Sequence, residues 1–257
     1  MEKQKVWFKD LGQMAYKAAW DYQESLMQEN LKLKAEAGSG QIGGTTKANE
    51  RKENDATPLA TKNYLLFVEH PPVYTLGKSG KMEHVLINEK ERQQKGIDFF
   101  QTNRGGDITF HGPEQLVGYP VLDLEKFYTD IGRYLRELEE VIILTLADFD
   151  IAAGRSAGET GVWIDGNCRG KERKICAMGV RCSRWITIHG FALNVNTDLS
   201  YFNHIIPCGI QNKKVTSMKE ELGHDVSMTN VKEKLKQNFE KVFHTELTTH
   251  HPPLINP

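Results

Sequence analysis

The sequence predicts an α+β fold, with a mixed, mostly antiparallel sheet flanked by helices. Helical and strand patterns both occur along the 257 residues. The strand patterns cluster without the regular helical crossovers that a doubly wound parallel sheet requires. With 39% apolar and 26% charged residues, the chain can build a sizeable core and remain in solution, as one large domain or two small ones.

The first part of the chain begins with a helical pattern and then changes composition. Between residues 11 and 37, apolar side chains recur at helical spacing and predict an amphipathic helix packed on the domain. Residues 37–62 are glycine-rich, polar and charged, with Ile42 and Leu59 as their only large apolar side chains. Such a segment buries too little surface to offset its ordering entropy, which favours a flexible surface insertion over a functional lid.

The strands that follow are short apolar runs bounded by turn residues. "YLLFVEH" is stopped by Pro71 and Pro72, "IDFFQT" by the glycine turn "NRGGD", and "QLVGYPVLDL" is a third run. The apolar stripe of "DIGRYLRELEEVIILTLADF" predicts a helix. Three more strands follow, "GVWID", "KICAMGVRC" and "WITIHGFALNVN", of which the first two form a hairpin through "GNCRGKER". A last helix is expected around "SMTNVKEKLKQNFEKVF".

Charge and cysteine content exclude several classes of protein. The formal net charge of −1 gives no bulk attraction to nucleic acid or anionic membranes. The first residues lack the apolar region of a secretory signal, and no apolar run is long enough to cross a bilayer. The cysteines form neither a CxxC pair nor a zinc-binding cluster, and they are Cys168, Cys176, Cys182 and Cys208. We therefore expect a cytoplasmic protein with reduced thiols and no metal.

The stretch "IIPCGI" places Cys208 between a proline and a glycine, neither of which suits the middle of a helix or of a central strand. The thiol is therefore expected on a turn at the end of a buried segment, where it can face a cleft. Two interpretations are open at this point. Cys208 is an inert thiol that packs as a small hydrophobe, or it is a nucleophile.

Three further features each have a structural and a functional interpretation. In "RGGDITFHGP", Gly105 and Gly106 permit close approach of a ligand to the backbone, but a hairpin followed by a turn explains the same residues. The spacing matches neither a phosphate-binding P-loop nor a dinucleotide fingerprint. Lys174 precedes an apolar strand, where it either extends to solvent or enters a site and exchanges protons. Three histidines, His111, His189 and His204, each have two possible roles: a catalytic dyad with a cysteine, or ordinary hydrogen bonding.

Six segments follow one another along the chain in the order in which they occur in one protein family. They are "EHPPVYTLGKSG", "RGGDITFHGPEQLVGYPVLDL", "GVWIDG", "KICAMGV", "WITIHGFALNVNTDLSYFNHIIPCGI" and "VTSMKEELG". With these motifs the chain resembles the lipoyl(octanoyl) transferases, the octanoyl-carrier-protein:protein transferases of lipoate biosynthesis. The resemblance extends from Leu11 to the final helix, apart from the insertion at 37–62. One departure is Glu114, where the family usually has glycine within HGPGQ.

The resemblance implies a fold shared with lipoate and biotin protein ligases. It implies a single catalytic domain over residues 1–257, with 37–62 as a flexible insertion within it. The implied reaction moves an octanoyl group from octanoyl-acyl-carrier protein to a specific lysine of apo lipoyl domains, through a thioester on Cys208. The implied acceptors are the lipoyl domains of 2-oxoacid dehydrogenase complexes and the glycine cleavage H protein. No cofactor, nucleic acid or membrane is expected to take part.

The family's functional positions correspond to particular residues of this sequence. Its catalytic cysteine, in the PCG motif, corresponds to Cys208, and its catalytic lysine corresponds to Lys174. Its substrate-binding segments correspond to Arg104, Gly105, Gly106, Asp107, Ile108, Thr109, Phe110, His111, Ala177, Met178, Gly179, Gly190, Phe191 and Ala192. The alternatives are an amidotransferase that moves octanoyl or lipoyl groups between lipoyl domains, an ATP-dependent lipoate or biotin ligase, and a non-catalytic binding module. The ligase is disfavoured because its chemistry needs no cysteine nucleophile.

Overall fold

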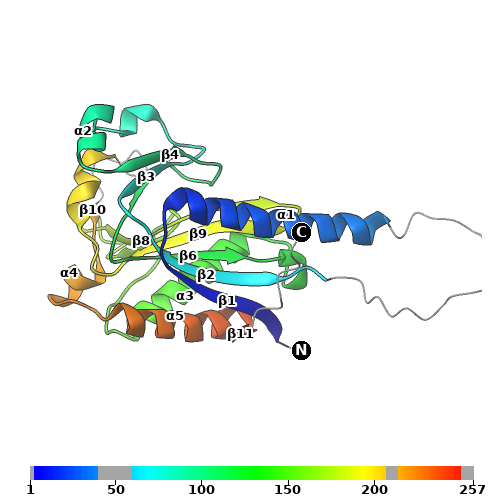
Figure 1. The fold of residues 1–257 in the computed structure, drawn as a ribbon. Coiled ribbons are helices and arrows are strands. Elements are labelled where there is room, and N and C mark those ends of the chain that lie inside the picture. The colour runs from blue at the N-terminus through cyan, green and yellow to red at the C-terminus, as the bar shows by residue number, and fades with distance from the viewer. Residues whose placement is uncertain (1–2, 40–59, 207–213, 250–257) are drawn as a thin grey trace, which may run out of the picture.

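The computed structural model of the protein describes residues 3–39, 60–206 and 214–249 (Figure 1). Cys208 and most of the insertion expected at 37–62 lie outside these ranges. In chain order the strands, α-helices and 3-10 helices (η) are β1 (Gln4–Gln13), α1 (Tyr16–Ser39), β2 (Asn63–Glu69), β3 (Val73–Leu76), η1 (Met82–His84), α2 (Glu89–Gln94), β4 (Asp98–Gln101), β5 (Ile108–His111), β6 (Gln115–Val121), η2 (Leu124–Lys126), α3 (Ile131–Ala147), β7 (Val162–Ile164), β8 (Arg173–Ser183), β9 (Ile186–Asn194), η3 (Leu199–His204), β10 (Lys214–Val215), α4 (Met218–Leu222), α5 (Met228–Phe243) and β11 (Thr245–Thr248).

Two sheets form the frame of the fold. The larger sheet has the strand order β10-β8-β9-β6-β2-β1-β11, with β7 also paired to β8. The pairs within the run β8-β9-β6-β2 are antiparallel, as is β7 with β8. β1 is parallel to both β2 and β11, and β10 is parallel to β8. A smaller sheet has the order β4-β3-β5. The predicted mixed, mostly antiparallel sheet is therefore confirmed.

Helices cover both faces of the larger sheet, with α1 on one face and α3 and α5 on the other (Figure 1). Successive residues of β2 point to opposite faces. Leu65 and Phe67 belong to the apolar core under α3 and α5, whereas Leu66 and Val68 belong to the core under α1. Because both faces are buried, this strand is a continuous apolar run without the polar alternation of a half-exposed strand.

The differences from the predicted elements concern the N-terminal region and the smaller sheet. The helix predicted from residue 11 begins at Tyr16, because Leu11 belongs to β1. Local periodicity does not reveal β1, since its exposed and buried residues alternate irregularly and one of its partners, β11, is at the other end of the chain. β3 and β5 have only four residues each and pair with one another. At "RGGDITFHGP", which includes β5, the sequence left a hairpin followed by a turn and a ligand site as equal alternatives. The other predicted strands and helices are confirmed.

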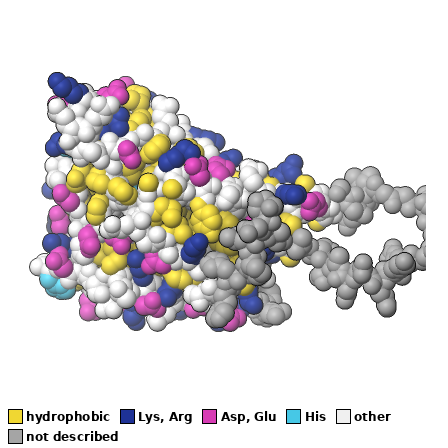
Figure 2. Space-filling model, in the orientation of Figure 1, with side chains coloured by type: hydrophobic (Ala, Val, Ile, Leu, Met, Phe, Trp, Pro, Cys, Tyr) yellow, Lys and Arg dark blue, Asp and Glu magenta, His cyan; other side chains and the backbone are white. Residues whose placement is uncertain are grey.

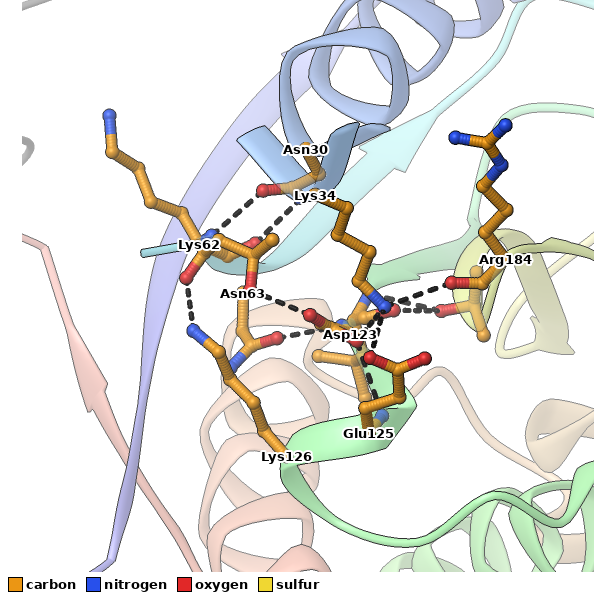
Figure 3. Close-up of polar contacts among 11 residues, drawn as sticks. Asn30, Lys34, Lys62, Asn63, Asp123, Glu125, Lys126 and Arg184 are labelled. Atoms are coloured by element: carbon orange, nitrogen blue, oxygen red, sulfur yellow. Dashed lines mark hydrogen bonds and ion pairs between the residues drawn. The ribbon is translucent and has the colours of Figure 1, made fainter. Parts of the chain in front are cut away.

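A polar network joins the two chain segments that flank residues 40–59 (Figure 3). The Asn30 side-chain amide donates to the Lys62 carbonyl, and the Lys62 backbone N–H donates to Asn30 Oδ1, both at 2.8 Å. Lys34 Nζ lies 2.6 Å from Asp123 Oδ1, and the side chains of this pair are only 14% and 4% exposed. The end of α1 and the residues leading into β2 are thereby held to one another and to the turn after β6.

The described surface carries charges of both signs. Basic and acidic side chains are interspersed over the face shown in Figure 2, and the formal net charge is −1. No helix in the described ranges is long and apolar enough to span a bilayer. Among those same residues, no three histidine, cysteine, aspartate or glutamate side chains gather as a metal site would require.

Candidate active site

A cavity of about 380 Å³ is lined by residues of both sheets, and this volume is within the range of small-molecule pockets. The lining comes from the start of α1, from strands of both sheets, from the 3-10 helices η1 and η3, and from three connecting loops. Its residues are Tyr16, Ser79, His84, Arg104, Gly106, Asp107, Ile108, Thr109, His111, Gln115, Val117, Tyr119, Gly158, Glu159, Thr160, Lys174, Ala177, Met178, Gly179, His189, Gly190, Phe191, Ala192, Asn194, Phe202 and Val215.

The cavity brings together Lys174 and most of the residues expected to bind substrate. Gly105 and Phe110 are the expected residues that do not line it. The Gly105 backbone N–H donates to the Val180 carbonyl at 3.0 Å, which attaches this part of the loop to β8. Phe110 is 1% exposed and stacks on Tyr201 with ring centroids 4.5 Å apart, within the core of the smaller sheet. Cys208 lies outside the described residues.

The loop from Arg104 to Asp107 packs closely between the smaller sheet and β8. A Cβ on Gly179 would lie 2.6 Å from the Gly105 carbonyl oxygen, and a Cβ on Gly77 would lie 2.3 Å from the Gly106 carbonyl oxygen. Any larger residue at either glycine would push the loop away from the sheet. Gly77 and Gly179 are therefore required because the backbone of the loop lies too close to them to leave room for a side chain.

Arg104 is the charged residue at the centre of this loop, and it is only 7% exposed. Its Nη2 donates to the Thr75 carbonyl at 2.6 Å, to the Thr75 hydroxyl at 2.9 Å and to the Asp107 carbonyl at 2.9 Å. Its Nη1 donates to the Gly105 carbonyl at 2.9 Å. The guanidinium thus fixes the loop against β3 and places a positive charge beside the cavity.

His111 is buried and is part of a chain of hydrogen bonds that begins at Arg104. Thr75 Oγ1, which accepts from Arg104, lies 3.3 Å from His111 Nε2. Gln115 donates its amide N–H groups to the Phe110 carbonyl and to Asn194 Oδ1, so its Oε1 accepts from His111 Nδ1 at 2.9 Å. Burial, together with the nearby His70 and Arg104, lowers the pKa of His111 well below its ordinary value. Both ring nitrogens are occupied in a neutral ring, which makes His111 a structural connector and a poor base.

His189 is also neutral, and it adopts a strained backbone conformation. Its φ of 60° lies in the left-handed region, which is uncommon within a strand for a residue other than glycine. Its backbone N–H donates to Gln23 Oε1 at 2.8 Å, and its Nε2 donates to Asn103 Oδ1 at 2.8 Å. Burial, reinforced by the charges of Arg104 and Arg181, lowers its pKa from 6.5 to about 3. Its Nε2 is therefore committed to Asn103.

Lys174 lies at the start of β8 and lines the cavity, so its side chain does not simply extend to solvent. It is paired with Trp163 of β7 and Val215 of β10, one on each side. Its Nζ lies 4.5 Å from the centre of the Trp163 ring, a distance at which an ammonium is attracted to the face of an indole. The lysine is thus half-buried, and the Trp163 ring on the neighbouring strand β7 orients its ammonium.

The three described cysteines are poorly placed for nucleophilic chemistry. Cys176 is fully buried, and burial raises the pKa of its thiol well above the ordinary value. Burial also raises the pKa of the half-buried Cys182. Cys168 is exposed in the turn between β7 and β8. None of these three residues lines the cavity.

Glu114, the departure from the family pattern, lies outside the cavity lining. Its φ is 60°, a conformation that glycine adopts without steric cost, and this explains the glycine usual at that position. The Glu114 carbonyl accepts from the Asn196 backbone N–H at 3.1 Å and from the Thr197 hydroxyl at 3.0 Å. The Asn196 amide donates to its carboxylate at 2.7 Å. The acidic side chain therefore supports the turn and leaves the cavity unchanged.

Sequence reasoning missed several residues of the lining. Gln115 and Asn194 were detectable in principle, because each is a polar residue at the end of an apolar strand. Tyr16 stacks on His111 with ring centroids 5.9 Å apart and an interplanar angle of 11°, a contact that no local pattern indicates. The loop residues 158–160 have no local signal either, since their place in the lining depends on how β7 pairs with β8.

The sequence is similar to a known family over most of its length. Residues 46–240 match the family model described as the lipoyl protein ligase A/B catalytic domain. The chain belongs to this family. An octanoyltransferase of Flavobacterium johnsoniae is 54% identical over 95% of this chain and 98% of its own length. An octanoyltransferase of Cytophaga hutchinsonii is 51% identical over 95% of this chain and 96% of its own length. The resemblance to the lipoyl(octanoyl) transferases is confirmed, and the protein is an acyltransferase.

Solved structures of the wider family share the fold. A bipartite lipoate protein ligase of Thermoplasma acidophilum superposes with a TM-score of 0.63 at 16% identity, covering 97% of this chain and 87% of the other. A lipoate-protein ligase A bound with ATP superposes with a TM-score of 0.62 at 16% identity, covering 97% and 89%. At this level of identity the likeness establishes the fold alone, and the predicted ligase-like α+β architecture is confirmed.

Proposed function

We propose that this acyltransferase moves an octanoyl group from octanoyl-acyl-carrier protein to a specific lysine of apo lipoyl domains, through a thioester on Cys208. The observation that carries the proposal is the cavity, which gathers Lys174 with segments 104–111, 177–179 and 190–192 of the family pattern. The acceptors are proposed to be the lipoyl domains of 2-oxoacid dehydrogenase complexes and the glycine cleavage H protein. The reaction is proposed to take place in the cytoplasm, where thiols stay reduced.

The proposed reaction has two acyl-transfer steps. In the first, the Cys208 thiolate attacks the donor thioester, the phosphopantetheine sulfur leaves as a thiolate, and it takes up a proton from the Lys174 ammonium. In the second, the acceptor amine attacks the octanoyl-enzyme, an amide bond forms, and the Cys208 thiolate leaves as the amine loses its proton. The first step exchanges one thioester for another and the second is downhill, so neither requires ATP.

Lys174 is proposed to act in both steps. As an ammonium it favours the thiolate form of Cys208, because an ordinary thiol has a pKa of about 8.5 and is only about 3% ionised at pH 7. Having given a proton to the leaving phosphopantetheine thiolate in the first step, Lys174 is a neutral amine and accepts the proton of the acceptor amine in the second step. His111 is unsuited to that task, because both of its ring nitrogens are already engaged.

Two features of the described chain support Cys208 as the nucleophile. On one side of Cys208, the backbone N–H of Ile206 donates at 2.9 Å to the carbonyl of His84, a lining residue. On the other side Val215 lines the cavity and pairs with Lys174. Described residues on both sides of Cys208 therefore lie at the cavity. None of the three described cysteines lines it.

The acyl chain is proposed to lie along the apolar part of the lining, which includes Val117, Met178, Phe191 and Ala192. Burying about seven carbons at about 0.8 kcal/mol each gives about 5–6 kcal/mol. One methylene more or less changes the affinity by only about fourfold on the same scale. Sharp selection of chain length therefore requires steric closure of the cavity.

The proposal is tested by supplying octanoyl-acyl-carrier protein and an apo lipoyl domain without ATP and measuring intact masses. We expect one octanoyl adduct on the enzyme and octanoylated lipoyl domain as product, and neither with Cys208→Ser. Lys174→Arg keeps a cation but cannot relay the proton, so it should accumulate octanoyl-enzyme and release it slowly. An adduct on Cys176, or transfer only from an already octanoylated lipoyl domain, would refute the assignment, the latter in favour of an amidotransferase.

A further inference from the structure

The loop between α3 and β7 lines the cavity on the side of Lys174. It contributes Gly158, Glu159 and Thr160 to the lining. Its two ends are joined by a pair of backbone hydrogen bonds between Gly154 and Trp163, both 2.8 Å long. These two hydrogen bonds fix the ends of the loop. The conformation of the residues between them depends on their other contacts.

One buried carboxylate, that of Glu139 on α3, holds both ends of this loop. Glu139 is 0% exposed. Its Oε2 lies 3.0 Å from Arg155 Nε, at the start of the loop, and 2.7 Å from Arg136 Nη1 on its own helix. Its Oε1 accepts at 3.0 Å from the backbone N–H of Gly161, at the end of the loop. A carboxylate accepts at both oxygens, and this geometry uses both of them.

The end of the loop that Glu139 holds packs against Lys174. Gly161 has a φ of 110°, and a Cβ built on it would lie 2.6 Å from the Cys176 carbonyl oxygen and 3.6 Å from Lys174 Cε. Two residues further on, Trp163 places its ring 4.5 Å from Lys174 Nζ. The strand register shifts between Val162 and Trp163, and such bulges redirect side chains next to functional sites. The stem of the lysine therefore lies next to the space that a side chain at Gly161 would fill, and its ammonium lies over the Trp163 ring of the adjoining strand.

We propose that Glu139 is a positioning residue for Lys174: by clamping Arg155 and Gly161 with one carboxylate, it holds the 155–162 loop and the Trp163 ring against the lysine. The consequence for turnover rests on the proposed role of Lys174. Glu139 itself does not touch the cavity. Its effect on transfer is therefore expected in kcat, with little change in the KM for the donor.

The test compares Glu139→Gln with Glu140→Gln in the full chain. Glutamine has the shape of glutamate but only one acceptor oxygen, so it can hold Gly161 or Arg155 and not both. Glu140 is the matched control, because it also pairs with Arg155, at 2.8 Å, but is 40% exposed and makes no contact with Gly161. Three quantities are measured: steady-state transfer, amide hydrogen exchange across residues 156–162, and the rate at which a small amine-reactive acetylating reagent modifies Lys174.

For Glu139→Gln we expect kcat to fall more than tenfold with KM for octanoyl-acyl-carrier protein within about threefold of wild type. Exchange in 156–162 should rise at least tenfold, and Lys174 should be modified faster. Glu140→Gln should match the wild type in all three measurements. If Glu139→Gln fails to fold, Arg155→Lys serves instead, because it loosens only the first end of the loop and should raise exchange in the same residues.

Two results would overturn the proposal. One is wild-type kcat and wild-type exchange in Glu139→Gln, and the other is an equal loss of activity in both glutamine variants. Lys174→Ala separates this proposal from the proposed function. If that variant kept full turnover, the role of Lys174 would be wrong and the expected fall in kcat with it, whereas faster exchange confined to 156–162 in Glu139→Gln would still support the clamp.

Discussion

Three buried histidines, His70, His111 and His189, should make the protein lose stability as the pH falls from 7 to 5. His70 donates from Nδ1 to the Met14 carbonyl at 2.7 Å, and its Nε2 accepts from the Tyr119 hydroxyl at 2.7 Å. Burial lowers the pKa of His70 from 6.5 to about 4, although the Met14 hydrogen bond opposes the shift. Burial likewise lowers the pKa of His189 to about 3 and that of His111 well below its ordinary value.

Stability falls with decreasing pH because these histidines have different pKa values in the folded and unfolded protein. In the unfolded chain each imidazole has a pKa of about 6.5 and takes up a proton as the pH falls below that value. In the folded protein His70 and His189 stay neutral until the pH approaches 4 and 3. The unfolded state therefore binds more protons, and folding stability falls as the pH decreases from 6.5. At pH 5 each of these two residues costs about 2 kcal/mol relative to pH 7, or about 4 kcal/mol together, and His111 adds to the loss.

Urea unfolding at pH 7, 6 and 5 measures this loss directly. His70→Gln should make the free energy of unfolding less dependent on pH, by about one proton, because glutamine can donate to Met14 and accept from Tyr119 without titrating. His224→Gln is the control, since it makes the same substitution at an exposed histidine. A free energy of unfolding that changes by less than about 1 kcal/mol between pH 7 and pH 5 would refute the reasoning.

Two further predictions concern the network of Figure 3 and the segment next to it. Lys34→Met leaves the buried carboxylate of Asp123 without its cation, so it should destabilise the protein by about 3–5 kcal/mol and lower the Tm by about 10 °C. Lys62→Met, which removes the more exposed pair with Glu29, should cost less than about 1 kcal/mol, and equal Tm values for the two variants would contradict this argument. Replacing residues 39–60 with a short Gly/Ser linker should leave transfer activity within a fewfold and barely change the Tm, because α1 spans about 35 Å from its end at the segment to its start at the cavity. A large loss of turnover with an unchanged Tm would show that the segment takes part in function.

The sequence alone determined the elements with strong local patterns and the family. The apolar stripe at 130–149 and the short apolar run at 64–70 identify a helix and a strand, because helical and strand periods are set within a few residues. The ordered motifs identified the family and pointed to Lys174, to the 104–111 segment and to Cys208. Glu114 was recognised as a departure from the same comparison.

Only the tertiary structure decided which residues share the cavity and in what state. Tyr16 reaches His111 from another part of the chain, and Glu139 reaches Gly161 across 22 residues, through packing that no local period encodes. The neutral state of His189 follows from the removal of water and from the charge of Arg104, both of which exist only after the sheets have packed together. Sequence motifs identify individual residues of the site. Their protonation states and contacts depend on desolvation and on packing between distant parts of the chain, which exist only in the folded protein.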